Sequence, residues 1–415
     1  MGFFVKLRGM RDILPEEIDI WRKVEQKFIE ISELFGFKEI RVPILESKYL
    51  FEKGIGRDTD IVMKEMYEFK DKKGRDVVLR PEGTASVVRA YIENKIYEKR
   101  KIARFYYLGP MFRYDRPQKG RYRQFYQFGV ECFGGKSFYF DGETILLLNT
   151  VLEKLNIENS IFLINSLGCK DCKVKYTEHI KGYLEKIIDK LCNDCKIRFR
   201  VNPLRVFDCK NYSCQQAIEN LSSIYNFLCK ECKEHFDLLV NFLENNKINF
   251  KIEYKLVRGL DYYTKTVYEV FCKNQDIAIA GGGRYDYLVE EMGGPNTPAV
   301  GFAVGIDRIV TLLNQEKKDK DESVYLIFLG EQARVKGCDI MKKLIENKIK
   351  VEVDYEERTI NEHLRIANKY GKRLCLILGE NEIKKGVVVI KNMDTRTQEE
   401  IKEEEIVKVL KERIK

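Results

Sequence analysis

Two aromatic-rich stretches that flank a short basic loop constrain the fold of this chain most. Residues 103–108 and 125–133 have the composition of extended strands, and the segment 117–120 between them is typical of a loop tip. A second pair of strand-like runs, 66–69 and 77–79, flanks the hairpin loop 71–74. Strands that return through hairpins, without regular helical crossovers, predict an antiparallel sheet.

Helical patterns surround this predicted sheet. Apolar residues recur at three- or four-residue spacing over 12–35, which predicts a helix. Cysteine pairs, lysines and helical runs such as 175–190 fill residues 165–249, which indicates a mainly helical insertion. Sheet-like sequence resumes over 254–271, so the class is α+β.

The last part of the chain has a different, regular pattern. A polar linker at 314–323 is followed by an alternation of strands and helices, which predicts a small α/β domain over 323–415. Strands are expected at 324–329, 351–353, 374–378 and 387–390, and helices at 332–347, 359–370 and 399–414.

Composition narrows the class of protein. No run approaches the roughly 18 apolar residues of a membrane helix, and the first residues lack the apolar core of a signal peptide. We therefore expect a cytoplasmic protein without a membrane partner. The net charge of +9 is compatible with a polyanionic partner and equally with solvated lysine-rich helix faces.

The loop at 113–123 is the sharpest local feature. Five basic residues and one acid lie within eleven positions, next to aromatic strands. Basic groups interleaved with aromatic rings suit phosphates and stacked bases; the alternative is a solvated hairpin loop. Four other stretches are unusual for a scaffold, although each alone fits a turn or a packing motif: 80–84, 258–263, 281–285 and 301–308.

Taken together, these stretches resemble the class II aminoacyl-tRNA synthetases over nearly the whole chain. The helix 21–35 with 40–43 is similar to motif 1 of that family, 112–125 to motif 2 and 301–308 to motif 3. The segments 258–263 and 281–285 look like the two signatures of histidyl-tRNA synthetases, and 8–15 resembles their amino end.

The resemblance implies a fold, an activity and partners. The fold would be a class II catalytic domain over 1–320, an antiparallel sheet flanked by helices, with the insertion at 165–249 and an α/β anticodon-binding domain over 323–415. The activity would be ATP-dependent ligation of histidine to tRNA(His) through a histidyl-adenylate. Mg²⁺ would accompany the ATP, and the protein would be a homodimer joined through motif 1.

The resemblance also implies the site residues. Arg113 and Arg258 would be catalytic. ATP would be held by Arg113, Arg121, Arg123, Phe125 and Arg308. Histidine would be held by Glu82, Gly83, Thr84, Gln127, Glu131, Arg258, Tyr262, Tyr263 and Tyr285. Asp115 and Asp307 stand where the family often has glutamate, so neither is assigned a role.

Eight of the twelve cysteines lie between Cys169 and Cys232. Taken in sequence order they form two sets, Cys169/Cys172/Cys192/Cys195 and Cys209/Cys214/Cys229/Cys232, and the first has the spacing of a zinc site. Structural zinc and free buried thiols both remain open, because catalysis in this family does not call for zinc. Catalytic zinc is not expected.

Three other functions compete with this interpretation. A regulatory paralogue that senses histidine would lack the anticodon-binding domain and parts of the ATP motifs. A class II synthetase for another amino acid would lack the tyrosine pair and Glu131, and an RNA-binding module would not need Arg113, Arg258 and Arg308 together. The histidines His179, His235 and His363 fall in no motif, and we expect them at the surface or in satisfied structural positions.

Overall fold

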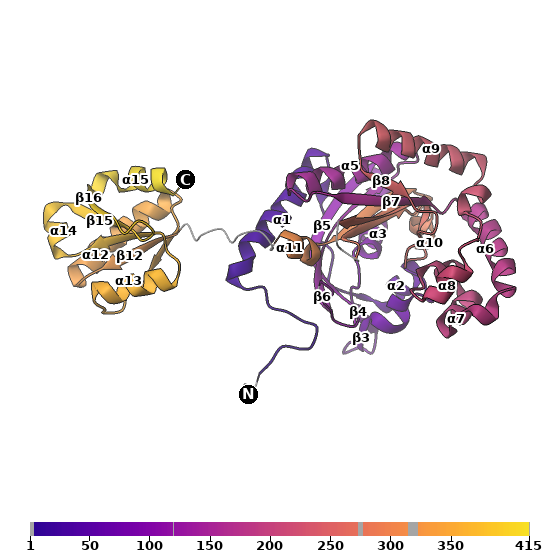
Figure 1. The fold of residues 1–415 in the computed structure, drawn as a ribbon, viewed down its shortest axis with the longest axis horizontal. Helices are drawn as coiled ribbons and strands as arrows, with labels where there is room; N and C mark the ends of the chain where they lie inside the picture. Colours follow the sequence, from indigo (N-terminus) through magenta and orange to yellow (C-terminus); the bar gives the residue numbers. More distant parts are fainter. Residues whose placement is uncertain (1–3, 119, 273–276, 314–322, 415) are drawn as a thin grey trace. The chain divides into compact units, whose positions relative to one another are not determined.

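The computed structural model describes residues 4–118, 120–272, 277–313 and 323–414. The chain divides into two compact units, Met1–Gln315 and Glu316–Lys415 (Figure 1). The linker predicted over 314–323 falls, apart from Ser323, outside the described residues, as does Lys119 of the basic loop. Within the described ranges, no helix combines the length and the apolar character needed to cross a membrane.

An eight-stranded sheet is the frame of the first unit, in the order β1-β5-β6-β11-β10-β9-β7-β8. Its interior pairs are antiparallel, as predicted, and the edge pairs β1–β5 and β7–β8 are parallel, so the whole sheet is mixed. The strands are β1 (Lys38–Glu39), β5 (Ala103–Phe112), β6 (Gln124–Phe133), β7 (Ser160–Ser166), β8 (Phe250–Ile252), β9 (Thr264–Cys272), β10 (Ala280–Arg284) and β11 (Ala299–Gly305).

Four helices pack on one face of this sheet: α1 (Pro15–Leu34), α5 (Phe138–Lys154), α9 (Lys230–Asn245) and α11 (Ile306–Leu313). The helix predicted over 12–35 begins at Pro15, whose fixed φ and missing N–H suit the first helical position. Trp21 and Phe28 of α1 pack with Phe128 and Val130 of β6 in one apolar core. This core fixes the sheet from behind.

The other face of the sheet carries α3 (Thr84–Glu93) and α10 (Leu288–Glu291). Beside them, a small sheet of order β2-β4-β3 contains the predicted hairpin. Its strands are β2 (Leu45–Ser47), β3 (Tyr67–Lys70) and β4 (Asp76–Leu79). The short helix α2 (Lys48–Gly54) packs on this sheet, and α4 (Ile96–Lys99) packs against α3. A second apolar core, with Tyr91, Phe133 and Tyr285, lies on this face.

The insertion between β7 and β8 is mainly helical, as predicted. Its helices are α6 (Lys170–Glu185), α7 (Asn193–Val201), α8 (Tyr212–Ala217) and α9 (Lys230–Asn245), joined by short 3-10 turns. The helix expected over 175–190 is α6, which begins and ends five residues earlier. The strand expected from 254 begins only at Thr264, because 254–263 is an irregular segment that passes the cavity described below.

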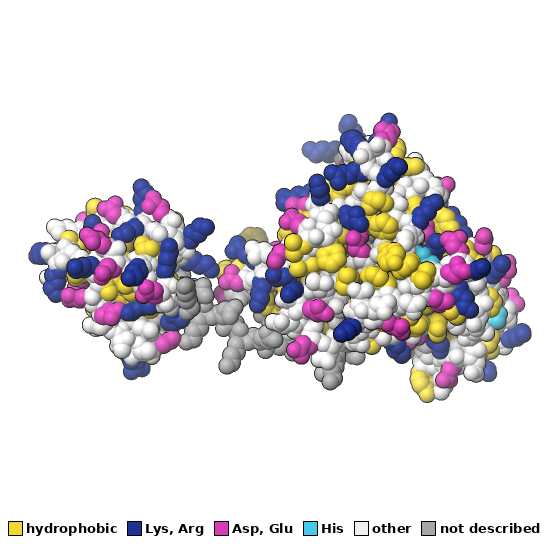
Figure 2. All heavy atoms as spheres, turned by 90° about the horizontal axis from the view of Figure 1, so that it is seen from above, with side chains coloured by type: hydrophobic (Ala, Val, Ile, Leu, Met, Phe, Trp, Pro, Cys, Tyr) yellow, Lys and Arg dark blue, Asp and Glu magenta, His cyan; other side chains and the backbone are white. Residues whose placement is uncertain are grey.

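The second unit has a five-stranded sheet of order β13-β12-β14-β15-β16. The strands are β12 (Val324–Phe328), β13 (Val351–Val353), β14 (Leu374–Leu378), β15 (Val387–Asn392) and β16 (Gln398–Lys402), and the helices are α12 (Glu331–Glu346), α13 (Ile360–Lys369), α14 (Glu380–Lys385) and α15 (Ile406–Arg413). On the face drawn in Figure 2, basic and acidic side chains of this unit are interspersed rather than separated.

One predicted element of this unit is wrong in part. The helix expected over 399–414 begins only at Ile406, because residues 398–402 form the edge strand β16. Ile401 is the buried residue of that strand and pairs with Val388. Only one of the five residues of this edge strand is apolar and buried, so the sequence does not show the alternation of apolar and polar residues that predicts a strand.

Candidate active site

A cavity of about 320 Å³ lies on the α3 side of the large sheet. All predicted site residues except Gly83 and Arg123 line it. They come from the start of α3 and the segment before it, the β5–β6 loop, strand β6, the segment before β9, the residue after β10 and the start of α11. Residues predicted from separate motifs therefore meet around one space.

Strand β6 supplies three of these residues through its two-residue period. Phe125, Gln127 and Glu131 face the cavity, whereas Phe128 and Val130 between them face the core under α1. A shift of register by one residue would turn all three away from the cavity. The core behind the sheet therefore determines which β6 side chains reach the site.

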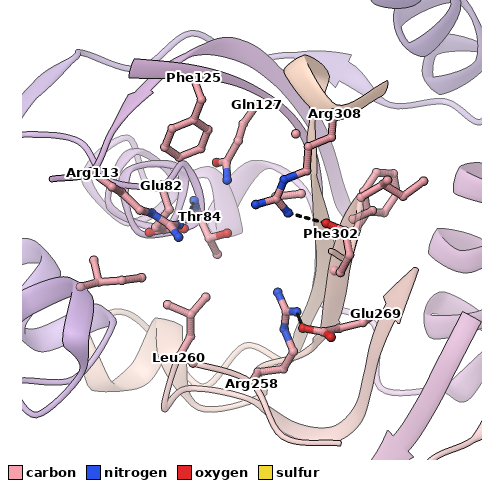
Figure 3. Close-up of a pocket in the computed structure, with 18 of the residues that line it drawn as sticks. Glu82, Thr84, Arg113, Phe125, Gln127, Arg258, Leu260, Glu269, Phe302 and Arg308 are labelled. Atoms are coloured by element: carbon pink, nitrogen blue, oxygen red, sulfur yellow. Dashed lines mark hydrogen bonds and ion pairs between the residues drawn. The ribbon is translucent and has the colours of Figure 1, made fainter. Parts of the chain in front are cut away.

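Three arginines from distant segments point into the cavity (Figure 3). Arg113 donates from Nε to the Pro81 carbonyl at 2.8 Å. Arg308 donates from Nε to the Gly120 carbonyl at 3.3 Å and also bonds the Ala278 carbonyl. Arg258 forms an ion pair with Glu269. The Nε of Arg258 is buried and has no partner among the described residues.

The electrostatics of these arginines favour an anionic ligand. Burial, followed by the charges of Arg121 and Arg113, lowers the pKa of Arg308 to about 10. Burial also lowers the pKa of Arg113. Arg258 differs: against the effect of burial, the charge of Glu269 raises its pKa. Polyphosphate is the kind of ligand that would relieve this crowding of positive charge.

Glu131 forms the buried end of the cavity. It is 1% exposed, and burial raises the pKa of its carboxyl to about 8. Its Oε1 accepts from the Thr84 hydroxyl at 2.7 Å, and its Oε2 accepts from the Tyr285 hydroxyl. Tyr262 lies against both Tyr285 and Tyr263, with ring centroids 5.5 and 4.7 Å apart. The result is a small aromatic pocket with one carboxyl and several hydroxyls.

Polar groups from the start of α3 flank this pocket. The Glu82 carboxylate accepts from the backbone N–H groups of Thr84 and Ala85 at 2.7 and 2.8 Å. Glu82 therefore satisfies two backbone N–H groups in the first turn of α3. The Gln127 Oε1 is buried and has no partner among the described residues. It remains available to a donor in the cavity.

Two glycines make room for these side chains. A Cβ at Gly281 would lie 2.4 Å from an Arg258 guanidinium nitrogen, and Gly281 pairs with Glu269 on β9. A Cβ at Gly301 would lie 2.1 Å from the Glu131 Oε2. Gly281 and Gly301 are therefore required by the close approach of Arg258 and Glu131.

Two predicted residues lie outside the cavity lining. The Arg123 guanidinium stacks over Tyr114, 3.6 Å from the ring centroid, and donates to the carbonyls of Asp115 and Arg8. Its ATP-binding role is therefore not supported by its position. Gly83 packs against the Tyr107 ring, where an added Cβ would lie 2.2 Å from it.

Several residues at the site were missed or left unassigned. Glu269 was not predicted, although its place opposite Gly281 on β9 follows from strand register. Asp307 accepts from the Tyr126 N–H at 2.8 Å, and Asp115 pairs with Arg121 at 2.8 Å. Both of these carboxylates therefore hold parts of the site in place.

A buried ion pair next to the site was also missed. Arg284, within the glycine-rich motif, pairs with Asp141 of α5. Burial alone would raise the pKa of Asp141, but the positive charge of Arg284 holds this pKa well below its usual range. No local signal near Asp141 marks it as the partner. The pair joins β10 to α5.

The insertion cysteines group differently from their order in the sequence. Cys169 and Cys172 lie with Cys229 and Cys232, and Cys192 and Cys195 lie with Cys209 and Cys214. The sequence-order sets Cys169/Cys172/Cys192/Cys195 and Cys209/Cys214/Cys229/Cys232 are therefore wrong. The chain folds back so that α9 begins beside the start of α6, which spacing alone does not reveal.

The histidines agree only in part with their predicted positions. His363 is fully buried, and neither ring nitrogen has a partner among the described residues. It is therefore neither at the surface nor satisfied. His235 is also buried, with its Nε2 3.4 Å from Asp141.

Known proteins resemble the chain over nearly its whole length. The family model described as histidyl-tRNA synthetase matches residues 9–169 and 202–309, and the model described as anticodon binding domain matches 323–413. The histidine–tRNA ligase of Thermodesulfovibrio yellowstonii is 47% identical over 98% of this chain and 97% of that protein. That of Desulfatibacillum aliphaticivorans is 45% identical over 95% of each.

A solved structure agrees with these relatives. The crystal structure of apo S. aureus histidyl-tRNA synthetase matches with a TM-score of 0.81 and 32% identity, over 98% of this chain and 100% of that one. The likeness includes the five-stranded unit, which the second family model covers.

Proposed function

This chain belongs to the histidyl-tRNA synthetase family, and we propose that its cavity joins histidine to ATP before the histidyl group passes to tRNA(His). The activity is that of a class II histidine–tRNA ligase in translation. One observation carries the assignment of the site: Arg113, Arg258 and Arg308 point into a cavity that also contains the buried carboxyl of Glu131.

In the first step, a carboxylate oxygen of histidine attacks the α-phosphorus of ATP. The new O–P bond gives histidyl-adenylate, and the bond to the β-phosphate breaks and releases diphosphate. Because both reactants are anionic, the protein must neutralise charge and align the atoms. Arg113 holds the α-phosphate, Arg258 holds the α-phosphate and the histidine carboxylate, and Arg308 holds the distal phosphates.

Further contacts position the nucleotide. Phe125 stacks on adenine, and Arg121 lies near it. Support comes from the Arg113 guanidinium, which lies 5.5 Å from the centroid of the Phe125 ring. A base on the exposed side of that ring would have its phosphates next to Arg113.

The aromatic pocket recognises histidine. Glu131 accepts from one imidazole N–H, and Tyr263 and Tyr285, together with Tyr262, provide hydroxyls for the ring. The histidine ammonium donates to Gln127, Thr84 and Glu82. The unpartnered Gln127 Oε1 supports this role. The hydroxyls of Thr84 and Tyr285, which donate to Glu131, support a pocket that selects its ligand through hydrogen bonds. An apolar amino acid in the pocket would leave these groups without hydrogen-bond partners. Its kcat/KM should therefore be about four orders of magnitude lower than that for histidine.

Magnesium is proposed to arrive with ATP. Among the described lining residues, Glu269 is paired with Arg258 and Asp115 with Arg121. These carboxylates are already neutralised, so the phosphates are the better ligands for the ion. A Mg²⁺ ion bound with ATP would lower the charge on the phosphates, and the arginines of the chain would provide the remaining contacts.

The family also supports a proposal for the second step and for the assembly. The terminal ribose hydroxyl of tRNA attacks the histidyl carbonyl carbon, and AMP leaves. The α/β unit matched by the anticodon-binding model would bind the anticodon. We propose a homodimer joined through the motif 1 region, where Leu34, Ile44 and Leu45 are exposed apolar residues, and a cytoplasmic location, where translation takes place.

Amino-acid-dependent exchange of diphosphate into ATP tests the proposal. Exchange that depends on histidine, and on no other standard amino acid, is expected. Exchange with another amino acid would assign the pocket to a different synthetase. No exchange by folded protein would favour the histidine-sensing regulatory paralogue.

A further inference from the structure

The insertion contains two groups of four cysteines that the proposed reaction does not use. The first group is Cys169, Cys172, Cys229 and Cys232, and the second is Cys192, Cys195, Cys209 and Cys214. Within each group, all sulfur atoms lie within 4.8 Å of one another. Seven of the eight residues are buried or half-buried, and only Cys229 is exposed.

The sulfur separations fit a shared tetrahedral ion and not a disulfide. The Cys169 and Cys172 sulfurs are 3.5 Å apart, and the Cys192 and Cys209 sulfurs are 3.8 Å apart. Tetrahedral Zn²⁺ with Zn–S bonds of about 2.3 Å places its sulfurs about 3.8 Å apart. A disulfide would bring two sulfurs to about 2.05 Å, and all eight residues have free thiols.

The local backbone also favours metal-binding thiolates. Cys169, Cys192 and Cys229 each precede the first residue of a helix, α6, α7 and α9, and the second cysteine of each pair lies one turn on. Backbone N–H groups donate to the sulfurs: Cys229 N to Cys172 Sγ at 3.1 Å, Cys192 N to Cys214 Sγ at 3.2 Å and Asn211 N to Cys209 Sγ at 3.4 Å. Such bonds orient ligand sulfurs and stabilise their negative charge.

We propose that each group binds one Zn²⁺ through its four sulfurs, so that the insertion holds two structural zinc ions. Each ion forms four Zn–S bonds, and the four thiol protons pass to solvent. Four protein ligands close the coordination sphere and leave no position for substrate. Buried free thiols could also pack as small apolar groups, but packing does not require four sulfurs to converge twice.

The two sites fasten segments that contact the irregular segment 254–263 beside the cavity. In α6, which begins at the first group, Lys173 Nζ donates to the carbonyls of Asp261 and Tyr263 at 3.1 and 3.5 Å. Asn202 lies between Cys195 and Cys209 of the second group, and its Nδ2 donates to Asp261 Oδ1 at 3.0 Å. Each zinc would therefore brace one side of the turn that carries Tyr262 and Tyr263.

Zinc analysis of the untagged full-length protein is the direct test. After dialysis against metal-free buffer, mass spectrometry should find two zinc ions per chain. X-ray absorption at the zinc edge should show four sulfur neighbours at about 2.3 Å. One zinc or none per chain, or nitrogen or oxygen among the neighbours, would overturn the proposal without any variant having to fold.

Paired substitutions test which cysteines share an ion. Cys172→Ser/Cys232→Ser removes two ligands from one group and should lose about one zinc of the two. Cys172→Ser/Cys195→Ser damages both groups and should lose both. The opposite result would return the pairing to sequence order and refute the grouping. Cys338→Ser, at an exposed cysteine outside both groups, is the matched control and should keep both ions.

Discussion

The cavity on the large sheet and the cysteine-rich insertion hold their side chains in place by different means. Around the cavity, hydrogen-bonded strands set the spacing of the residues, and an extended apolar core under α1 and α5 fixes those strands. In the insertion, α7 and α8 have nine and six residues and alternate with 3-10 turns. Helices this short are marginal by themselves.

The sheet and the insertion depend on different interactions for their stability. The sheet keeps its shape when one polar side chain is removed, so substitutions at the cavity should affect the reaction and leave the fold intact. The insertion is built from short helices whose buried residues, such as Tyr176 and Leu184, belong to the second apolar core, and metal cross-links would stabilise such short elements further. Loss of its metal should loosen the insertion first and affect the cavity through the contacts of Lys173 and Asn202 with the turn at 261–263.

The largest expected effect is that of Arg258→Ala. Loss of this guanidinium removes a charge that the α-phosphate and the carboxylate both need, so histidine-dependent diphosphate exchange should fall about a thousand-fold. Circular dichroism and gel filtration should show an intact fold, because β9 and β10 remain packed. Arg396→Ala, at an exposed arginine of the second unit, should exchange normally. Near-normal turnover by the Arg258 variant would refute its assigned role.

Glu131→Gln should have the next largest effect. Glutamine keeps the shape but lacks the negative charge that accepts the imidazole N–H, so the KM for histidine should rise about a hundred-fold. Burial raises the pKa of Glu131 to about 8, and its carboxyl therefore ionises as the pH rises through that value. In the unmodified protein, kcat/KM for histidine should increase over that range. A variant with the same rising limb would show that another group titrates.

The residues around the cavity were easier to predict from the sequence than the partners within the insertion. The cavity residues lie at strand ends and in local motifs, so the positions of Arg113, Glu131 and Arg308 could be expected together. The sequence could not predict that Arg123 stacks on Tyr114 outside the cavity lining, because that contact depends on side-chain geometry. The partner of Arg258, Glu269, required the strand register.

In the insertion, the sequence identified the cysteines that we propose as zinc ligands, but it did not show which of them share an ion. Spacing identified the three Cys-x2-Cys pairs, because each occupies one turn at the start of a helix. Which pairs meet depends on how α6 and α9 return to the same place, and that path is set by tertiary packing. The edge strand β16 was missed for a similar reason, since its pairing with β15 is not encoded in its own five residues.

Disrupting the second cysteine group should have a moderate effect on catalysis. Cys209→Ser should release one zinc ion and make the segment around α7 and α8 more sensitive to protease. The KM for histidine should rise about ten-fold, less than the hundred-fold that a displacement of about 1 Å can cost, and the KM for ATP should change less. Cys338→Ser is the control. If zinc is lost and the histidine KM is unchanged, the insertion does not brace the cavity.

Asn202→Ala tests the contact between the insertion and the cavity without removing a zinc ligand. It should have the smallest effect on the KM for histidine. The substitution removes the 3.0 Å hydrogen bond to Asp261 but no zinc ligand, so the zinc content should stay at that of the unmodified protein. A hydrogen bond that a carboxylate accepts contributes about 1.5 kcal/mol or more. Because Lys173 still holds the same turn, only part of this should reach the cavity, as a rise in the KM for histidine of about five-fold. Asn226→Ala, at an exposed asparagine of the same insertion, should leave the KM unchanged. An unaltered KM in the Asn202 variant would mean that the contact is incidental, and the insertion would then support the cavity only through Lys173.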